Sequence, residues 1–276
     1  MRSISLIELP YDSGRFNERM GRGPRAVLNA GLADYLQTRD FRVEVTPVRL
    51  PDGFYTDEQA LVELQRLAVP SITEALDSSA RPIVLSGNCA TAALSAVCAL
   101  GARETAVIWF DAHGDFNTPE TSASGFLDGM ALAILTGRCW PKLAERLQNF
   151  HAVPEKHVVQ IGVRSPDLPE EMNFQKSAIT RIGPKELWKL KDALEKLRVR
   201  HFYLHLDVDV LDPSEGHANP FACSGGVSLE DLVDALKVIG RTSKIAAGSV
   251  TAYDPAADSD GRIGRAIPRL VELLAQ

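Results

Sequence analysis

The sequence predicts an α/β fold built around a mostly parallel β-sheet of about eight strands. Short apolar runs rich in β-branched and aromatic residues recur along the chain, and they alternate with stretches whose apolar residues repeat every three to four positions. The apolar runs are nearly free of polar residues, which is typical of strands covered by helices on both faces. The 276 residues contain no low-complexity linker and no internal repeat, so we expect one domain spanning 1–276.

The expected strands and helices follow one another in the order that a parallel sheet requires. The strands are expected at 3–9, 43–50, 82–85, 105–110, 157–163, 178–182, 201–210 and 244–253. The clearest helices are expected at 58–76, 90–100, 129–136, 185–197, 229–239 and 266–274. Ser228 followed by Glu230 and Asp231 is a helix start signal, because acidic residues in the first turn complement the helix dipole.

Composition argues against several classes of protein. With 30 basic and 36 acidic residues the formal net charge is −6, whereas a nucleic-acid partner would call for a basic surface. No run approaches the roughly 20 apolar residues of a membrane helix, and the amino-terminal segment turns acidic too early for a signal peptide. The cysteines lack the close pair spacing of a zinc ribbon or a disulfide framework: Cys89, Cys98, Cys139 and Cys223. We therefore expect a soluble cytoplasmic protein.

Two clusters of metal-capable side chains follow predicted strands. Asp111, His113 and Asp115 alternate after the strand at 105–110, so an extended backbone would place all three on one side. Asp207 and Asp209 stand two residues apart in the same way after the apolar run that begins at 202. A single pair of this kind would be interpreted as a helix cap or an Asx-turn. Two groups instead favour a bound cation, because clustered carboxylates repel one another without one.

The chemistry of these side chains limits which ion they would hold. Four aspartates and one histidine offer mainly oxygen ligands, which suit Mn²⁺ above all, with Fe, Ni or Zn as alternatives. Carboxylates shared between two ions would make a two-metal site, which can activate water near neutral pH. Cys89 follows the strand at 82–85 and lies level with both clusters, so it is a candidate further ligand. Cys98 and Cys139 are expected to be inert core residues.

These segments resemble the ureohydrolase superfamily, which comprises arginases, agmatinases, guanidinobutyrases and formiminoglutamases. The resemblance runs from Gly-Pro-Arg-Ala at 23–26 to the last expected strand. Its most specific segment is Asp-Ala-His-Gly-Asp-Phe-Asn-Thr-Pro-Glu-Thr-Ser-Ala-Ser-Gly at 111–125, and the second is Asp-Val-Asp-Val-Leu-Asp-Pro at 207–213. The resemblance implies the arginase-like fold, a three-layer α/β/α sandwich around an eight-stranded, mostly parallel sheet.

The resemblance also implies a reaction and a role for each metal-capable residue. A hydroxide held between two manganese ions would hydrolyse a guanidino or amidino group. Asp111 and Asp207 would bridge the ions, Asp115 would join one of them, and His113 and Asp209 would join the other. Asp115 would have a second, catalytic role, orienting the nucleophile or carrying its proton.

Matching positions further imply how a substrate would be held. Asn117 and Ser124 match residues that bind the substrate's α-carboxylate in arginases, and Asp167 and Glu170 match acidic residues that engage its α-amino group. The segment 164–170 alone would be interpreted as a solvated charged turn. Together the four residues favour an α-amino acid substrate over agmatine or guanidinobutyrate. The family commonly forms trimers or hexamers, so a homo-oligomer is expected.

Three functional positions depart from the family pattern. Cys89 stands where the family usually has a metal-binding His. Either its thiolate binds an ion, although a thiolate suits Mn²⁺ less well than an imidazole does, or Cys89 is not a ligand. Asp128 stands where arginases carry a proton-shuttling His, a catalytic role that Asp could fill near neutral pH only with a raised pKa. Ala252 replaces a Glu that grips the guanidinium, and Asp254 or Asp128 is the candidate replacement.

Several hypotheses about function follow. Gly-Asn-Cys at 87–89, with Phe-Asn-Thr-Pro-Glu-Thr at 116–121 and Gly-Phe-Leu-Asp-Gly-Met at 125–130, is most similar to a subset of arginase-like proteins. That subset includes Nω-hydroxyarginine hydrolases, which release hydroxyurea and ornithine. The leading hypothesis is therefore a metal-dependent amidinohydrolase that acts on arginine or a modified arginine. The alternatives are another C–N hydrolase of the superfamily, of formiminoglutamase, agmatinase or guanidinobutyrase type, and a catalytically inactive metal-binding protein. Ala252 favours the inactive protein, and the intact Asp and His set argues against it.

Overall fold

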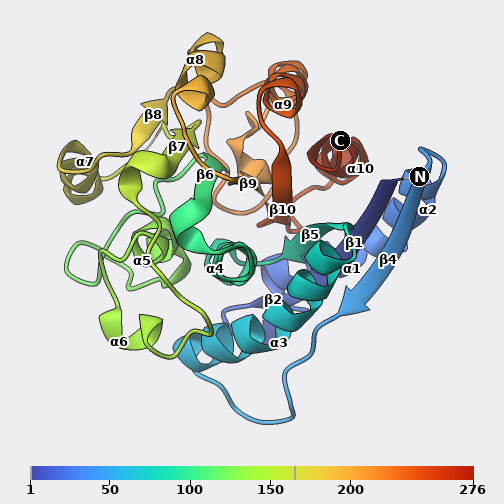
Figure 1. Ribbon diagram of the computed structural model, residues 1–276, viewed down its shortest axis with the longest axis horizontal. Helices are drawn as coiled ribbons and strands as arrows, with labels where there is room; N and C mark the ends of the chain where they lie inside the picture. Colours follow the sequence, from blue (N-terminus) through green and yellow to red (C-terminus); the bar gives the residue numbers. More distant parts are fainter. Residues whose placement is uncertain (1, 165) are drawn as a thin grey trace.

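The computed structural model describes residues 2–164 and 166–276, and an eight-stranded sheet forms its centre (Figure 1). The strand order is β4-β1-β5-β10-β9-β6-β7-β8, and every pairing in this sheet is parallel. The strands are β1 Arg2–Leu9, β4 Phe41–Pro47, β5 Arg81–Ser86, β6 Thr105–Phe110, β7 Val158–Ile161, β8 Thr180–Ile182, β9 His201–Asp207 and β10 Ile245–Thr251. The last strand of the chain, β10, therefore lies in the middle of the sheet, between β5 and β9.

Helices cover both faces of the sheet, which makes the three-layer α/β/α sandwich expected from the sequence (Figure 1). One face carries α3 Asp57–Asp77, α4 Cys89–Leu100 and α5 Ala131–Leu135. The other carries α1 Gly23–Asn29, α2 Leu32–Gln37, α8 Leu190–Glu195, α9 Leu229–Thr242 and α10 Arg262–Leu274. Connecting segments contain α6 Pro141–Ala144, α7 Leu168–Gln175 and the small hairpin of β2 Tyr11–Asp12 and β3 Arg15–Phe16.

None of the helices in the described ranges is both long enough and apolar enough to span a membrane.

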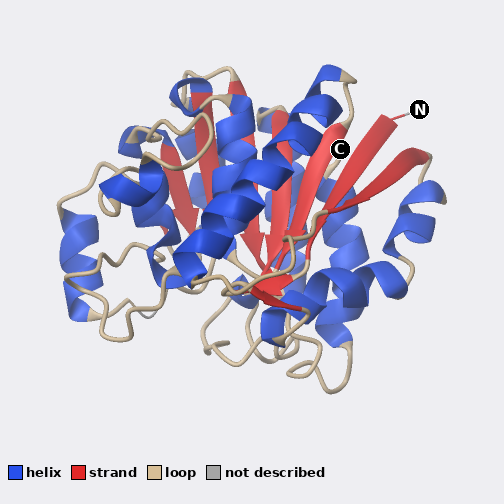
Figure 2. Cartoon of the chain, turned by 90° about the horizontal axis from the view of Figure 1, so that it is seen from below, coloured by secondary structure: helices blue, strands red, loops and turns tan. Residues whose placement is uncertain are grey.

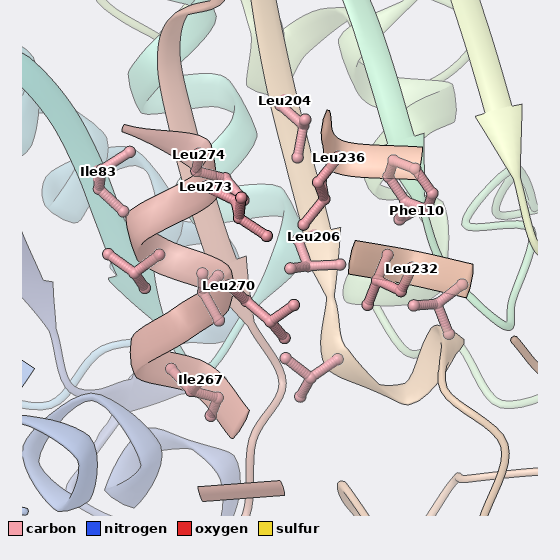
Figure 3. Close-up of a cluster of buried hydrophobic side chains, with 14 of the residues drawn as sticks. Ile83, Phe110, Leu204, Leu206, Leu232, Leu236, Ile267, Leu270, Leu273 and Leu274 are labelled. Atoms are coloured by element: carbon pink, nitrogen blue, oxygen red, sulfur yellow. The ribbon is translucent and has the colours of Figure 1, made fainter. Parts of the chain in front are cut away.

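The apolar faces of the helices form the core with the central strands. Leu232 and Leu236 of α9 belong to one buried cluster with Phe110 and Leu206 of the sheet, and α10 contributes Leu270 to the same cluster (Figure 3). On the opposite face α4 is buried along nearly its whole length, because it is enclosed between the sheet, α3 and α5. A helix of small and apolar residues is suited to such a position.

The eight expected strands are all present, and each end lies within about three residues of its predicted position. The strand predicted at 201–210 ends at Asp207, because 208–210 form a 3₁₀ turn in which the Asp209 N–H donates to Asp207 Oδ1 at 2.9 Å. The predicted start of α9 is confirmed, since Ser228 Oγ accepts from the Asp231 N–H at 3.1 Å. The helices α1, α2, α6 and α7, of four to eight residues, were not predicted, because so few residues show hardly any apolar repeat. The equally short α5 and α8 were predicted, since each follows a 3₁₀ turn that lengthens the helical stretch.

The parallel arrangement brings all carboxyl ends of the strands to one edge of the sheet. Figure 2 shows the strands ending at this edge, where long loops gather. Ligands of open parallel sheets bind at this edge, because the loops there supply side chains from several strands at once. The polar clusters of the sequence follow β5, β6, β9 and β10, which are neighbours in the sheet.

Candidate active site

A pocket of about 250 Å³ opens over the carboxyl ends of these central strands. It is lined by all six residues expected to bind metal: Cys89, Asp111, His113, Asp115, Asp207 and Asp209. Asp128 and three of the residues expected to bind substrate, Asn117, Asp167 and Glu170, line it as well. A larger depression of about 720 Å³ lies among the amino ends of the strands and contains none of these residues. The residues singled out in the sequence therefore gather in one place.

The segment after β6 is fixed by its own hydrogen bonds. The His113 N–H donates to Asp111 Oδ1 at 2.7 Å, and Trp109 Nε1 donates to Asp111 Oδ2 at 3.1 Å. Asp115 has a φ of 50°, a left-handed conformation that non-glycine residues rarely adopt. Its carbonyl oxygen accepts from two N–H groups at the start of α5, at 2.8 and 3.2 Å. Backbone strain that is held in this way is common at functional sites.

The clusters from β6 and β9 meet at the imidazole of His113. His113 Nδ1 lies 3.2 Å from Asp209 Oδ2 and 3.4 Å from Asp111 Oδ1. Asp209 Oδ1 also accepts from the Ala112 N–H at 3.2 Å. These contacts lower the pKa of Asp209 to about 2 although burial alone would raise it, and the main cause is the hydrogen bond with His113. Two carboxylates and one imidazole therefore form a compact donor set.

Cys89 joins the second half of the pocket floor. It is the first residue of α4, it is buried, and its Sγ lies 3.2 Å from Asp207 Oδ2 and 3.2 Å from Thr251 Oγ1. Gly87 lets the turn before α4 pack against the backbone at Tyr11, because a Cβ there would lie 2.4 Å from the Tyr11 carbonyl oxygen. Cys89 therefore faces the carboxylate cluster, as a metal ligand would.

The electrostatics of the cluster call for added positive charge. Burial raises the pKa of Asp115 and of Asp207 well above the ordinary range, and neighbouring aspartates raise both further. Burial would lower the pKa of His113, but hydrogen bonds to the two aspartates beside it raise that pKa overall. One imidazolium cannot balance four buried carboxylates, so the cluster needs protons or cations.

The residues present fit divalent cations. Asp115 Oδ2 is buried without a hydrogen-bond partner in the described part of the chain, and a cation would satisfy that lone pair. Two donor sets have ligand atoms within 4.8 Å of one another: Asp111, His113 and Asp209 in one, and Cys89, Asp111 and His205 in the other. Asp111 belongs to both sets, as a carboxylate shared between two ions would.

The wall of the pocket joins the segment after β6 to the start of α7. Asp167 caps α7 by accepting from the Glu170 N–H at 2.8 Å, and Asn117 Nδ2 donates to Asp167 at 3.4 Å. Glu170 Oε1 accepts from the Phe116 N–H at 2.9 Å, and a Cβ on Gly114 would lie 2.3 Å from the Glu170 carboxyl carbon. Burial raises the pKa of Glu170 to about 7. Glu170 is therefore buried, unlike the charges of a solvated turn.

Asp128 lies against the amino terminus of α4. Asp128 Oδ2 accepts from the Cys89 N–H at 3.0 Å and from Asn88 Nδ2 at 3.1 Å, and Asp128 Oδ1 accepts from the Ala90 N–H at 2.8 Å. The first N–H groups of a helix have no acceptor inside the helix, and here Asp128 is the acceptor for two of them. Burial raises the pKa of Asp128 to about 6, although these hydrogen bonds act to lower it. Its contacts are those of a residue that positions Cys89.

The structure does not bring the remaining substrate candidates to the pocket lining. Ser124 is exposed, and its Oγ accepts from the Phe126 N–H at 3.1 Å. Asp254 Oδ1 accepts from the Ala256 N–H at 2.9 Å, within the turn that follows β10. Ala252 lines the pocket with a φ of 55°, and among the described residues no carboxylate from the segment after β10 lines it.

Sequence reasoning missed several residues that shape the pocket. Asn219 Nδ2 donates to Asp209 Oδ2 at 3.1 Å and to the Ala252 carbonyl at 2.9 Å, so it connects the ends of β9 and β10. Phe126 and Phe221 line the pocket with ring centroids 6.2 Å apart. These three residues lie in irregular loops, where no periodic pattern indicates which side chains point inward.

Comparisons with known proteins agree with this geometry. Residues 2–275 match the sequence profile described as the Arginase family. The arginase of Staphylococcus aureus (strain COL) is 28% identical over 294 residues, which cover 98% of this chain and 96% of the relative. The arginase of Bacillus caldovelox is 29% identical over 278 residues, which cover 94% of this chain and 93% of the relative.

Solved structures give the same result. The native arginase structure from Bacillus caldovelox superposes with a TM-score of 0.88 at 25% identity, covering 100% of this chain and 98% of that one. A formimidoylglutamase from Bacillus subtilis superposes with a TM-score of 0.79, covering 100% of this chain and 86% of that one, and at 16% identity it shows the fold alone.

The contacts of Asp128 predict the effect of Asp128→Asn. The substitution keeps the size of the side chain but replaces one accepting oxygen with an NH₂ group that faces N–H donors of α4. We expect the free energy of unfolding to fall by about 1–3 kcal/mol, because buried donors lose their acceptor. Urea denaturation followed by circular dichroism measures this. The exposed Asp52→Asn is the matched control, and equal stability of the two variants would contradict the capping role.

Proposed function

The chain belongs to the arginase family, and from that membership we propose a divalent-metal-dependent amidinohydrolase that cleaves the guanidino group of arginine or a modified arginine. One observation carries the proposal: six metal-capable side chains from three strand ends line one pocket whose wall also presents Asn117, Asp167 and Glu170. The relatives named arginase, which match nearly the whole chain, support this class of reaction.

We assign the pocket floor to two ions, with Mn²⁺ first and Fe, Ni or Zn as alternatives. Asp111 and Asp207 would lie between the ions, His113 and Asp209 would hold one of them, and Cys89 and Asp115 would hold the other. The contacts of His113 with Asp209 and of Cys89 with Asp207 support this division. When bound, the ions would supply the Lewis acidity that activates water near neutral pH. Besides holding its ion, Asp115 is proposed to orient that water or carry its proton.

The wall of the pocket would hold the amino-acid end of the substrate. Asp167 and Glu170 present carboxylates to an α-amino group, and Asn117 presents an amide to an α-carboxylate. Ser124, the other residue expected to contact the α-carboxylate, is exposed outside the pocket lining, so we give Asn117 the larger share of this contact. A volume of about 250 Å³ suits a single amino acid, since pockets for drug-sized ligands measure roughly 300–1,000 Å³.

The guanidino end meets a different environment. Ala252 supplies no carboxylate, and the two candidate replacements have other partners: Asp128 caps α4, and Asp254 accepts from the turn after β10. A guanidinium would therefore lack its bidentate partner. Hydroxylation lowers the basicity of a guanidine, so the missing carboxylate would weaken the binding of Nω-hydroxyarginine less than the binding of arginine. We therefore propose Nω-hydroxyarginine as the preferred substrate, with hydroxyurea and ornithine as the products.

The competing substrates fit the wall less well. Formiminoglutamate carries its amidine on the α-nitrogen and has a second carboxylate, which Asp167 and Glu170 would repel. Guanidinobutyrate has no amino group for these residues to hold, and agmatine has no carboxylate for Asn117. An inactive metal-binding protein remains the contrasting hypothesis, and it predicts bound metal without turnover.

A direct assay tests the proposed function. Protein reconstituted with Mn²⁺, Fe²⁺, Ni²⁺ or Zn²⁺ is expected to release hydroxyurea from Nω-hydroxyarginine faster than urea from arginine. Asp207→Ala should lose both ions by elemental analysis, because it removes a shared ligand, whereas the exposed Asp52→Asn should keep both. No turnover of any guanidino substrate with any metal would refute the reaction, and formamide release from formiminoglutamate would favour that alternative. Unchanged metal content in Asp207→Ala would refute the ligand assignment.

Glu170→Gln tests the proposed contact with the α-amino group. The amide keeps the oxygen that accepts from the Phe116 N–H but removes the negative charge. We expect KM for Nω-hydroxyarginine to rise about tenfold or more, because a hydrogen bond to a charged group contributes about 1.5–3 kcal/mol. Glu171→Gln is the matched control, since Glu171 lies on the same helix as Glu170 but pairs with Arg181 of β8 at 2.8 Å. An unchanged KM in Glu170→Gln would remove Glu170 from the substrate site.

Ala252→Glu tests the guanidino end of the pocket. Restoring a carboxylate should raise kcat/KM for arginine by about 10- to 100-fold, because a charge-assisted hydrogen bond to the guanidinium is regained. Ala252→Gln has the same size without the charge and should give little of this gain. Steady-state kinetics with arginine and Nω-hydroxyarginine measure the change in preference. Equal activity of the Glu and Gln variants toward arginine would show that the missing charge does not set the preference.

A further inference from the structure

We propose that His205 is a further metal ligand, which supplies an imidazole to the ion that Cys89 faces. The inference rests on the proposed function, because it concerns one of the two ions assigned there. Cys89 stands where the family pattern has a histidine, so the other ligands assigned to this ion are a thiolate and carboxylates. His205 would return a nitrogen donor to this ion from a different strand.

The position of His205 brings its ring to the cluster. His205 lies on β9 two residues before Asp207, so both side chains leave the strand on the same side. A ring nitrogen of His205, Cys89 Sγ and a carboxylate oxygen of Asp111 all lie within 4.8 Å of one another. Donors on a tetrahedral ion with bonds of about 2.0–2.3 Å stand about 3.3–3.8 Å apart. A modest closing of the three side chains would therefore let one ion contact them all.

Hydrogen bonds and stacking hold the ring in the orientation that a ligand needs. His205 Nδ1 lies 2.9 Å from Ser249 Oγ and 3.1 Å from Tyr203 Oη, which leaves Nε2 toward the cluster. The Trp109 ring stacks on the imidazole with centroids 3.8 Å apart, and Trp109 Nε1 donates to Asp111. Metal-binding histidines commonly make a hydrogen bond through their second nitrogen, because that bond fixes the tautomer and the ring direction.

The hydroxyl of Thr251 shows that the thiol and the imidazole face a common point. Thr251 Oγ1 lies 3.2 Å from Cys89 Sγ and 3.2 Å from His205 Nε2. All three side chains are buried, so an ion there would have no competing bulk water. The contrasting interpretation is that His205 is only a hydrogen-bonded core residue, with Thr251 as its final partner. The number of imidazoles bound to metal separates the two interpretations.

The assignment has a consequence for metal choice. A thiolate and an imidazole on one ion are softer than the carboxylate-rich set around His113 and Asp209, so the two positions differ in chemistry. Soft and borderline donors favour Zn²⁺, Fe²⁺ or Ni²⁺ over Mn²⁺ at the position beside Cys89 and His205. The position beside His113 would retain the preference for harder ions.

Zinc K-edge X-ray absorption of protein carrying two zinc ions per chain tests the proposal without an activity assay. The wild-type protein is expected to show two imidazoles over the two ions, one from His113 and one from His205, with a sulfur at about 2.3 Å. His113→Asn and His205→Asn should each retain one imidazole. A His113→Asn spectrum without imidazole scattering would overturn the proposal, and this holds even if His205→Asn fails to fold.

Zinc affinity measured against a competing chelator adds a graded test. Tyr203→Phe removes a hydroxyl beside His205 Nδ1 but keeps the imidazole, so the affinity for one of the two zinc ions should fall by roughly 10- to 100-fold. His205→Asn removes the ligand itself and should weaken that zinc more, and an equal or smaller loss would overturn the proposal. Two firmly bound zinc ions with one imidazole would overturn only this inference. A wild-type protein that binds no divalent ion would overturn the proposed function as well.

Discussion

The burial of four carboxylates at one edge of the sheet is the constraint on which the rest of the site depends. Asp111, Asp115, Asp207 and Asp209 follow two neighbouring strands, and all four line the same pocket. Backbone N–H groups stabilise part of this charge, and His113 stabilises another part. The remainder has no counterpart among the described side chains, and this deficit makes a cation site the simplest chemical interpretation.

Much of the fold and part of the site could be predicted from the sequence, because the strands are apolar and the aspartates follow them directly. The pattern at 111–115 and 207–209 placed five candidate ligands on the pocket floor, and Cys89 lies beside them. Periodicity could not reveal α7, which is a short helix, or show that Asn219 faces the pocket, because Asn219 lies in an irregular loop. His205 was hidden for another reason: it lies inside a buried strand, and its approach to within 4.8 Å of Cys89 depends on how β9, β10 and α4 meet.

The departures from the family pattern acquire different meanings in the structure. Asp128, predicted to be catalytic, lines the pocket, and its carboxylate is hydrogen-bonded to the first turn of α4, which connects it to Cys89. Ala252 stands at the pocket with a left-handed backbone that Asn219 holds through the Ala252 carbonyl. The backbone at position 252 is therefore held in place at the pocket, although its side chain is a methyl group that cannot bind a guanidinium.

The central place of β10 also determines when the site can form during synthesis. The chain emerges from the ribosome in order, yet β10 at 245–251 must insert between β9 at 201–207 and β5 at 81–86, which is made much earlier. Until then both strands expose unpaired edges, and Cys89 lacks Thr251 and the wall around Ala252. Pairing of strands so distant in sequence is slow and leaves such edges open to aggregation. Capture of the proposed metal ions would thus be coupled to completion of the carboxyl-terminal segment, and a prematurely terminated chain would lack a closed site.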